Sequence, residues 1–317
     1  MEFSFLQYLC VIFSFLLATY LITPIFRALA IKLNILDKPG GRKLQKHAVP
    51  YLGGLAIIIP LFLSSLLLIF IPIFEVNRYE LLFGLVLPGI LMAAVGLLDD
   101  IYQLSAFSRL VSQSVAGFTT SYLLYRSNSG VQIFDNNLLN LLTTTIWIIG
   151  IINAFNFIDN MDGLAGGVAM FASFGFFVIS LSNGQLLVAA LSAAICGSCI
   201  GFLFWNKNPA RIYMGDSGAL FLGFMLAAIS IRVDSNGGNY LQSIFTPLVM
   251  LAIPFIDTSQ VIISRVRRGV SPLQGGRDHI SHKLLLLGVN EKRAVQIIWL
   301  GAFIFSITAV VISGVLN

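Results

Sequence analysis

Seven aspartates and all three histidines of the sequence fall in short polar segments between apolar blocks. A charged side chain in such a place usually keeps a helix end in water. These residues instead adjoin glycines and asparagines at membrane depth, where an unpaired carboxylate is costly. They are therefore candidates for cation binding or catalysis: Asp37, Asp99, Asp100, Asp159, Asp162, Asp216, Asp278, His47, His279 and His282.

The pair Asp99-Asp100 ends an apolar block that includes Gly96. Adjacent carboxylates repel each other and lose hydration there, unless a cation compensates. Consecutive residues of a helix point about 100° apart, so at most one of the two is expected to face a shared site squarely. Mg²⁺ suits such a site because it takes oxygen ligands, usually one or two carboxylates together with substrate phosphates. Mn²⁺ is the alternative ion.

A polar side chain stands at every third position from Asn153 to Asp162, with Asn156 and Asp159 between them. A regular α-helix would spiral these four groups by about 60° per step, whereas a 3₁₀ or looped stretch would align them. Capping of a helix that begins near Gly163 explains Asp159 or Asp162 but not all four. The segment therefore predicts a ligand site.

A third polar segment runs from Trp205 to Gly218. Pro209 breaks the preceding helix, and Gly215 allows a ligand to approach the backbone closely. Asp216 precedes a new apolar helix, whose N-terminus attracts phosphate. Tyr213 is either a ligand contact or an ordinary interfacial aromatic residue.

Two basic segments, 37–54 and 265–282, complete the set. Their lysines and arginines could contact anionic lipid head groups or a substrate. His279 and His282 beside Arg277 resemble phosphate or sugar ligands, because the segment offers no third ligand for zinc. Asp257 lies inside an apolar block, where it is either functional or hydrogen-bonded to a neighbouring loop.

The composition identifies the elements that must hold these groups. Of 317 residues, 57% are hydrophobic and 10% charged, against roughly 25% charged in soluble domains. Too few charges remain to coat a soluble enzyme or a nucleic-acid binder, despite a pI of about 9.2. The three cysteines lie within apolar blocks and are expected to pack as small residues: Cys10, Cys196 and Cys199.

The apolar residues form blocks long enough to cross a hydrocarbon core of ~30 Å as helices. The sequence thus predicts an all-α polytopic membrane protein with about ten transmembrane helices and a single domain over residues 1–317. The first block is not expected to be a cleavable signal, because Glu2 precedes it without a basic residue. The blocks are 4–24, 52–73, 81–98, 108–125, 137–152, 164–181, 186–204, 217–233, 241–264 and 294–315.

Lys and Arg are distributed unequally between alternate loops. One set of loops holds sixteen of them and the other holds three, namely Arg78, Arg126 and Arg232. Because basic residues stay on the cytoplasmic side, both termini are expected to be periplasmic. The five cytoplasmic loops then carry the acids and histidines and form the active site.

The order and the residue patterns of the motifs resemble those of the polyprenyl-phosphate N-acetylhexosamine-1-phosphate transferase family (glycosyltransferase family 4). The resemblance covers nearly the whole chain. Its motifs are D-x-P-x-x-R-K at Asp37–Lys43, P-x-x-G-G at Pro50–Gly54, D-D at Asp99–Asp100, N-x-x-N-x-x-D-x-x-D-G at Asn153–Gly163, M-G-D-S-G at Met214–Gly218 and a late loop with histidines.

The resemblance implies a ten- or eleven-helix fold and Mg²⁺-dependent transfer of a sugar-1-phosphate from a UDP-N-acetylsugar to undecaprenyl phosphate, which releases UMP. N-acetylglucosamine-1-phosphate is the favoured group. The implied setting is the bacterial inner membrane, with the active site on the cytoplasmic face, at the first membrane step of a cell-envelope polysaccharide pathway. No nucleic acid is expected as a partner, and a homodimer stays open.

The resemblance also implies roles for individual residues. Asp216, with Asp99, would ligate Mg²⁺. The candidate catalytic residues are Asp99, Asp100, Asp159, Asp162 and His279. The candidate substrate-binding residues are Asp37, Arg42, Lys43, Asn153, Asn156, Asn206, Tyr213, Arg277 and His282. Among all of these, Asn156, Asp159, Asp162, Asn206 and Tyr213 would bind the uridine part, and Arg277 and His279 the pyrophosphate or sugar.

Three departures from the family's pattern bear on the branch. The first loop has Gln45 where a histidine is usual, the late loop reads His279-Ile-Ser281-His282 where H-I-H-H is common, and one glycine is lost from the Asp159–Gly163 segment. Three successive histidines are missing, so a WecA/TagO-like enzyme is favoured over the MraY branch, the phospho-MurNAc-pentapeptide transferases.

Two other classes of protein stay open as alternatives. An anion transporter would place its polar groups at the midplane with a visible half-repeat, and a CDP-alcohol phosphotransferase would carry a different aspartate pattern.

A phosphate monoester has a second pKa near ~6, so the lipid phosphate is mostly dianionic at neutral pH. A strong general base is therefore not required. We rank Asp99 and Asp100 as organisers of metal and phosphates above proton acceptors.

Overall fold

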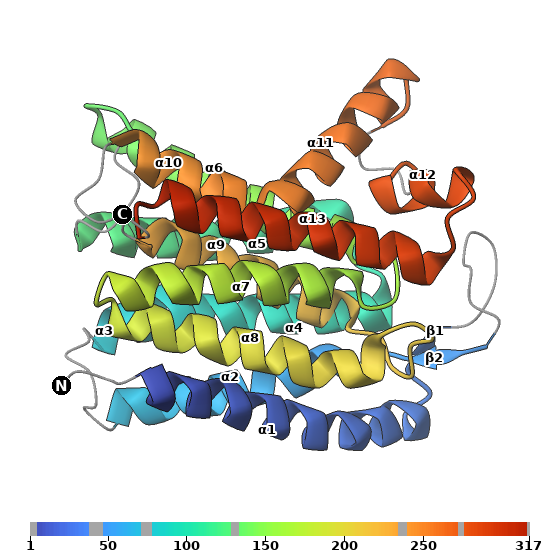
Figure 1. The fold of residues 1–317 in the computed structure, drawn as a ribbon. Coiled ribbons are helices and arrows are strands. Elements are labelled where there is room, and N and C mark those ends of the chain that lie inside the picture. The colour runs from blue at the N-terminus through green and yellow to red at the C-terminus, as the bar shows by residue number, and fades with distance from the viewer. Residues whose placement is uncertain are drawn as a thin grey trace.

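The computed structural model describes residues 5–37, 47–70, 78–127, 133–233, 240–271 and 276–315, and within them it is almost entirely helical (Figure 1). The helices are α1 (Phe5–Lys32), α2 (Gly53–Phe70), α3 (Arg78–Leu81), the π-helical η1 (Leu82–Val86), α4 (Leu87–Tyr102), α5 (Ala106–Arg126), α6 (Asn137–Ile158), α7 (Leu164–Ser182), α8 (Leu186–Asn206), α9 (Gly215–Arg232), α10 (Tyr240–Met250), α11 (Ala252–Arg267), α12 (Ile280–Leu286) and α13 (Glu291–Ile312).

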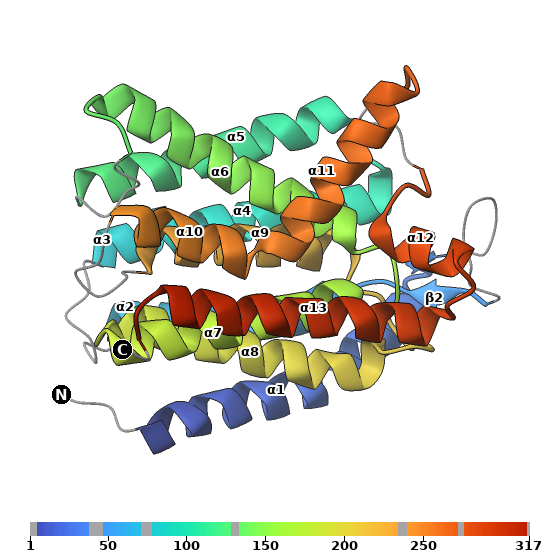
Figure 2. The ribbon, with the colours of Figure 1, turned by 45° about the horizontal axis from the view of Figure 1, so that its top comes forward.

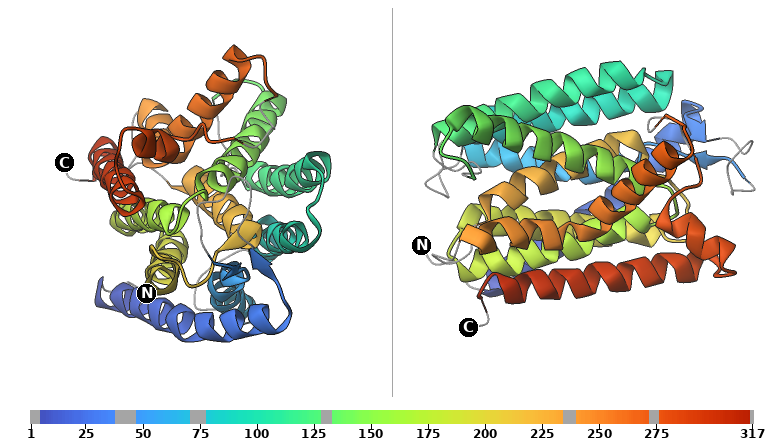
Figure 3. Two further views of the ribbon diagram at one scale, coloured as in Figure 1. Left: turned by 90° about the vertical axis from the view of Figure 1, so that its right-hand side faces the viewer. Right: turned by 90° about the horizontal axis from the view of Figure 1, so that it is seen from above.

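Helix α9 runs through the middle of the bundle (Figure 2), and every residue from Ser217 to Ser230 is buried. It packs against α2, α4 and α6. Helix α1 lies at the edge of the bundle against α8 (Figure 3). Most of its apolar side chains are exposed. A helix that is apolar on every face and buried in the centre, ringed by helices with exposed apolar faces, is typical of a membrane bundle.

Within the described ranges, seven helical stretches are long and apolar enough to cross a membrane, and the bent pair α10–α11 makes an eighth if it counts as one span. They are Phe5–Lys32, Leu82–Tyr102, Asn137–Ile158, Leu164–Ser182, Leu186–Asn206, Gly215–Arg232 and Glu291–Ile312. The predicted all-α polytopic class is confirmed. The apolar part of α2, Gly53–Leu67, is shorter.

The predicted blocks each overlap a helix, but two are not single straight helices. The third begins in α3 and η1 before it continues as α4. The ninth is broken between α10 and α11, which meet at 74°. Pro254 explains the break, because it has no amide proton to donate to the carbonyl of Met250 one turn earlier.

The polar segments gather at one end of the bundle. The strands β1 (Leu36–Asp37) and β2 (Val49–Pro50) pair antiparallel there, with Leu36 opposite Pro50 and Asp37 opposite Val49. Helix α12 and the C-terminal ends of α4 and α6 lie at the same end (Figure 1). The start of α1 and the end of α13 lie at the opposite end.

Candidate active site at the polar end of the bundle

Helices α4 and α9 approach closely where α4 ends. A Cβ atom on Gly96 would collide with the backbone of Asp216, so glycine is required at this crossing. The carboxylate of Asp100 then reaches the N-terminus of α9 and accepts hydrogen bonds from the amides of Asp216 (2.8 Å) and Ser217 (3.3 Å). Gly215, with φ +72°, leaves room for this carboxylate, since a Cβ there would lie 2.5 Å from Asp100 Oδ2.

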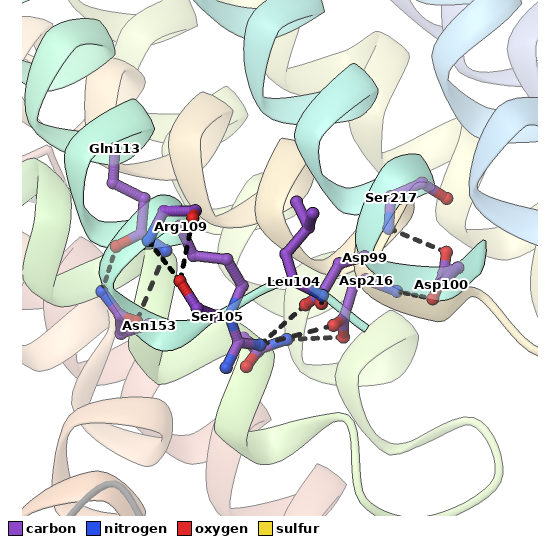
Figure 4. Close-up of polar contacts among 11 residues, drawn as sticks. Asp99, Asp100, Leu104, Ser105, Arg109, Gln113, Asn153, Asp216 and Ser217 are labelled. Atoms are coloured by element: carbon purple, nitrogen blue, oxygen red, sulfur yellow. Dashed lines mark hydrogen bonds and ion pairs between the residues drawn. The ribbon is translucent and has the colours of Figure 1, made fainter. Parts of the chain in front are cut away.

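Asp99, the neighbouring acid, faces a different way. Its Oδ1 accepts the amide of Leu104 at 2.7 Å, and its Oδ2 accepts Nη1 of Arg109 at 2.8 Å. The same Arg109 nitrogen lies 3.6 Å from Oδ2 of Asp216. Figure 4 shows the guanidinium between the carboxylates of Asp99 and Asp216, with Asp100 turned toward the start of α9. Two carboxylates thus share one cation.

Local structure fixes Arg109 in this position. Helix α4 ends at Tyr102 and is capped by Gln103, whose backbone is left-handed (φ 52°) and whose amide donates to the carbonyl of Asp99. Ser105 then caps α5 by accepting the amide of Ser108 at 3.0 Å. Arg109 therefore stands one turn into α5, beside the end of α4.

Asn153 and Asn156 of α6 point to different neighbours, because the helix is regular to Ile158. Asn156 donates to Oδ1 of Asp216 at 2.7 Å and so belongs to the acid cluster. Asn153 donates to Oε1 of Gln113 on α5 at 2.7 Å and to the carbonyl of Ile149 at 2.8 Å. The α-helical spiral, and not an aligned 3₁₀ stretch, is what separates them.

Asp159 ends α6 and begins the turn to α7, where no described residue donates a hydrogen bond to it. Burial, followed by the negative charges of Asp100 and Asp162, raises the pKa of Asp159 to about 7. An acid left without a donor at a site edge is free to bind a ligand.

Asp162 is held by the segment that follows α8. Its Oδ2 accepts the amide of Ala210 at 2.9 Å and the amide group of Asn208 at 3.2 Å, and it also hydrogen-bonds with Tyr213. Burial raises the pKa of Asp162, and these hydrogen bonds oppose the rise. Asn208 also donates to Glu291 of α13 at 2.9 Å.

Asn206 is 2% exposed and bridges two backbone segments. Its Oδ1 accepts the amide of Gly163 at 3.0 Å, and its Nδ2 donates to the carbonyl of Ile212 at 2.9 Å. Each end of its amide makes one hydrogen bond, so Asn206 positions the turn before α7 relative to the 207–213 segment.

The first polar loop is joined to the 213–218 segment through the backbone. The amide of Tyr213 donates to Pro50 at 2.8 Å, and the amide of Gly53 donates to Tyr213 at 2.9 Å. Asp37 is buried in β1, on the same small sheet as Pro50. Arg42 and Lys43 lie outside the described residues.

A buried pair joins α11 to the start of α12. Nδ1 of His279 lies 2.7 Å from Oδ2 of Asp257, and the two residues are 6% and 3% exposed. The ring of His279 meets those of Phe157 (6.2 Å) and His282 (5.8 Å) edge-on. Burial, then the charges of His279 and Arg277, lowers the pKa of His282. Arg277 is exposed.

Comparison with known proteins agrees with this arrangement. A family model described as glycosyl transferase family 4 matches residues 82–234. A probable undecaprenyl-phosphate N-acetylglucosaminyl 1-phosphate transferase of Bacillus subtilis is 35% identical, over 94% of this chain and 82% of that protein. The chain belongs to glycosyl transferase family 4.

Other relatives fit the same membership. A decaprenyl-phosphate N-acetylglucosaminephosphotransferase of Mycolicibacterium smegmatis is 31% identical over 90% of this chain and 78% of its own. An undecaprenyl-phosphate alpha-N-acetylglucosaminyl 1-phosphate transferase of Escherichia coli K12 is 28% identical over 90% of this chain and 80% of its own length. The resemblance seen in the motifs is thereby confirmed.

In this member of glycosyl transferase family 4, hydrogen bonds and ion pairs bring Asp99, Asp100, Asn156 and Asp216 together. A second group, Asp162 with Tyr213, adjoins Asp159. His279 joins a third group around Asp257. Asn153 is paired with Gln113 outside these groups, and Asn206 joins Gly163 to Ile212. The roles predicted for these residues stay predictions.

Arg109 contacts the acid cluster but belongs to none of the motifs. In the sequence it is one of the sixteen basic residues in the loops expected to be cytoplasmic. Its position could have identified it, because it is a lone cation at the polar end of a predicted helix, ten residues after Asp99. Gln113, which pairs with Asn153, carries no comparable signal.

The acid cluster offers oxygen ligands to a hard cation. In the described ranges, no three His, Cys, Asp or Glu side chains are grouped so as to hold a metal ion. Asp99 and Asp216 do converge on one cationic group, which shows that a positive charge is favoured between them. In many Mg²⁺ sites the protein supplies one or two carboxylates, and substrate phosphates supply further ligands.

Proposed function

We propose that the protein transfers N-acetylglucosamine-1-phosphate from a UDP-sugar to undecaprenyl phosphate and releases UMP. An oxygen of the lipid phosphate attacks the phosphorus attached to the sugar. A new P–O bond forms, and the bond from that phosphorus to the bridging oxygen breaks, so the bridging oxygen leaves with UMP. The names of the relatives support the acceptor class and the sugar.

The observation that carries the proposal is the meeting of acids, an amide and a cation at the start of α9. Arg109 lies between Asp99 and Asp216, and Asn156 donates to the latter. The positive dipole end of α9 favours negative charge at this place, where Asp100 already accepts the amides of Asp216 and Ser217. Transfer between two phosphates needs positioning and charge neutralisation above all.

Mg²⁺ is part of the proposal, with Asp99 and Asp216 as its protein ligands. The fit rests on the oxygen donors and on the cation that these two carboxylates already share. The ion would neutralise the charge that builds up on the transferred phosphate. Asp100 is committed to the amides of α9 and would hold the helix start in place.

The donor substrate is proposed to lie along the 159–163 turn and the 207–213 segment. Asp159 and Asp162 would face the uridine, with Tyr213 beside Asp162. Asn206 would act by holding the two segments together. Arg277 and His279 would meet the pyrophosphate or sugar, and Arg42 and Lys43 of the first loop would add positive charge.

The protein is further proposed to form one domain of ten spans in the bacterial inner membrane, with periplasmic termini and a cytoplasmic site. Helix α5 supports the count, although it is less apolar, because it exposes a stripe of large apolar side chains: Phe107, Leu110, Val111, Val115, Phe118 and Tyr122. The unequal distribution of Lys and Arg supports the orientation.

The test is turnover by the purified protein in lipid nanodiscs with undecaprenyl phosphate, Mg²⁺ and a panel of radiolabelled UDP-N-acetylsugars. UDP-N-acetylglucosamine should give a lipid-diphospho-sugar and an equal amount of UMP. A lipid product with another sugar would correct the donor. The proposal would be overturned if no donor gave a lipid product with protein that thermal melting shows to be folded.

A further inference from the structure

Asp257 joins the middle of one helix to the start of another. It stands on α11 and is 3% exposed. Its Oδ2 lies 2.7 Å from Nδ1 of His279, and its Oδ1 accepts the backbone amide of Ile280 at 2.7 Å. His279 is the residue before α12, and Ile280 is the first residue within it. One side chain therefore holds both the imidazole and the helix start.

Only a carboxylate satisfies both contacts. The amide of Ile280 is always a donor, so Oδ1 must accept. An ionised carboxylate can only accept at Oδ2 as well, so Nδ1 of His279 must carry the proton that it donates. An asparagine has one acceptor and one donor, and it could not serve two donors at these places. The pair thus fixes which nitrogen of His279 is protonated.

The remaining nitrogen, Nε2, is the one left for a ligand. The ring plane is set by edge-on contacts with Phe157 of α6 and His282 of α12. Ser281 donates to Oδ1 of Asn160 at 2.6 Å, which ties the start of α12 to the turn that contains Asp159. His279 is therefore held beside the acids at the end of α6.

Nearby charges are paired with other partners. Asp278 binds Arg265 (3.1 Å) and Arg268 (2.5 Å), and these two guanidiniums hold the pKa of Asp278 below its usual range although burial opposes them. Among described residues, Asp257 is the acid that contacts His279. An isolated buried carboxylate would be costly in a membrane span, so the pairing also explains why Asp257 is tolerated there.

We propose that Asp257 is a positioning residue that keeps Nδ1 of His279 protonated and presents Nε2, as a hydrogen-bond acceptor, to a hydroxyl group on the sugar of the donor substrate. The proposal rests on the proposed function for the identity of that sugar. Partners that orient a ligating histidine are commonly worth ~10–100-fold in activity or affinity. A residue that merely caps α12 would affect stability and would act independently of His279.

A double-mutant cycle separates the two roles. Asp257→Asn, His279→Gln and the double variant are assayed for kcat and KM, with Thr258→Val as a control in the same turn of α11. We expect Asp257→Asn to lower kcat ~10–100-fold and the double variant to be no slower than His279→Gln. Losses that multiply in the double variant would overturn the proposal. Thr258→Val should retain wild-type turnover.

A spectroscopic measurement decides the tautomer without any turnover. In nanodisc samples with ¹⁵N-labelled histidine, the signal that His279→Gln removes should show a protonated Nδ1 in the wild type. In Asp257→Asn it should show a protonated Nε2 or a mixture. An unchanged tautomer would overturn the proposal. If the wild type instead makes no lipid-linked product, the proposed function fails, while the nitrogen signals still test the pair.

Discussion

The side chain of Asp100 accepts a hydrogen bond from the backbone amide of Asp216, with Oδ1 and N 2.8 Å apart. One acid of the adjacent pair thus caps the central helix, and its neighbour Asp99 turns to Arg109. Two identical side chains next to each other in sequence therefore have different tasks: one holds the start of α9, and the other forms part of the charged cluster.

Asp100→Asn should destabilise the protein more than Asp99→Asn does. Asparagine keeps one acceptor, whereas Asp100 accepts two backbone amides of α9. Asp99 accepts one amide and the partly exposed Arg109, whose guanidinium can turn to water. Loss of a helix cap commonly costs ~0.5–2 kcal/mol. Thermal melting of both variants in the same nanodiscs measures the difference. Equal melting temperatures would mean that Asp100 does not hold α9.

Both variants should also be slow at every pH between about 6.5 and 9, because the lipid phosphate is ionised without a base. Rescue of either variant by alkali would favour a proton-accepting role instead.

The sequence predicted this division only in part. Helical geometry required that Asp99 and Asp100 point in different directions, and the apolar block placed both at a polar end. Which one would meet α9 could not be predicted, because it depends on the close approach that Gly96 allows between α4 and α9. Such crossings are set by packing and not by local pattern.

Helix packing also decides the partners of Arg109 and Asn153, which the sequence did not predict. The three-residue spacing suggested that Asn153 and Asn156 share a site, but α6 stays regular, and the helix that lies beside each face decides the partner. Asn153 meets Gln113 of α5, and Asn156 meets Asp216 of α9. For Asp257, the sequence left a functional role and a hydrogen bond to a loop open, and the structure shows the hydrogen bond.

Asp216→Asn should leave folding near normal and abolish Mg²⁺-dependent turnover. The amide can still accept from Asn156, so the local contact is retained while the metal-binding charge is lost. One such electrostatic contact is commonly worth ~10²–10³ in rate. Turnover across a Mg²⁺ titration measures it, with Asp135→Asn at the opposite end as control. Near-normal turnover would show that Asp216 is not a metal ligand.

Arg109→Gln should bind divalent cation more tightly but turn over more slowly. The guanidinium lies on the oxygens of Asp99 and Asp216 that a metal would use, so its removal frees them. At a partly exposed pair the gain in affinity should be a few-fold. Mn²⁺ binding followed by electron paramagnetic resonance tests it, with Arg126→Gln as the matched change at the other end of α5. Weaker Mn²⁺ binding by Arg109→Gln would contradict the idea that Arg109 competes with the metal for these carboxylates.

Cysteine labelling of intact cells should report the orientation of the bundle. Ser182 is exposed at the end of α7 that lies away from the acids, and Leu287 is 80% exposed just after α12. In a Cys10→Ser background, an impermeant maleimide should label Ser182→Cys and should label Leu287→Cys only after lysis. The basic residues gather at the Leu287 end, which is expected to be cytoplasmic. The reverse pattern of labelling would invert the topology.

Asp159→Asn should stabilise the protein at pH 8 and have little effect near pH 4. The pKa of the Asp159 carboxyl is raised to about 7, so the folded chain keeps this proton where the unfolded chain, with a pKa of ~4, has released it. Below ~4 both states are protonated and the group contributes nothing. As pH rises toward 7 the folded state loses stability relative to the unfolded state, and above 7 the penalty is complete.

Asparagine carries no such penalty, so the variant's melting temperature should exceed that of the wild type by a few degrees at pH 8. The difference should shrink as pH falls through the window from 7 to 4. Asp135→Asn, a change to an exposed acid, controls for loss of negative charge alone. A gain that is the same at pH 8 and pH 5 would show that repulsion of the Asp159 charge by Asp100 and Asp162, with its burial, is not the cause.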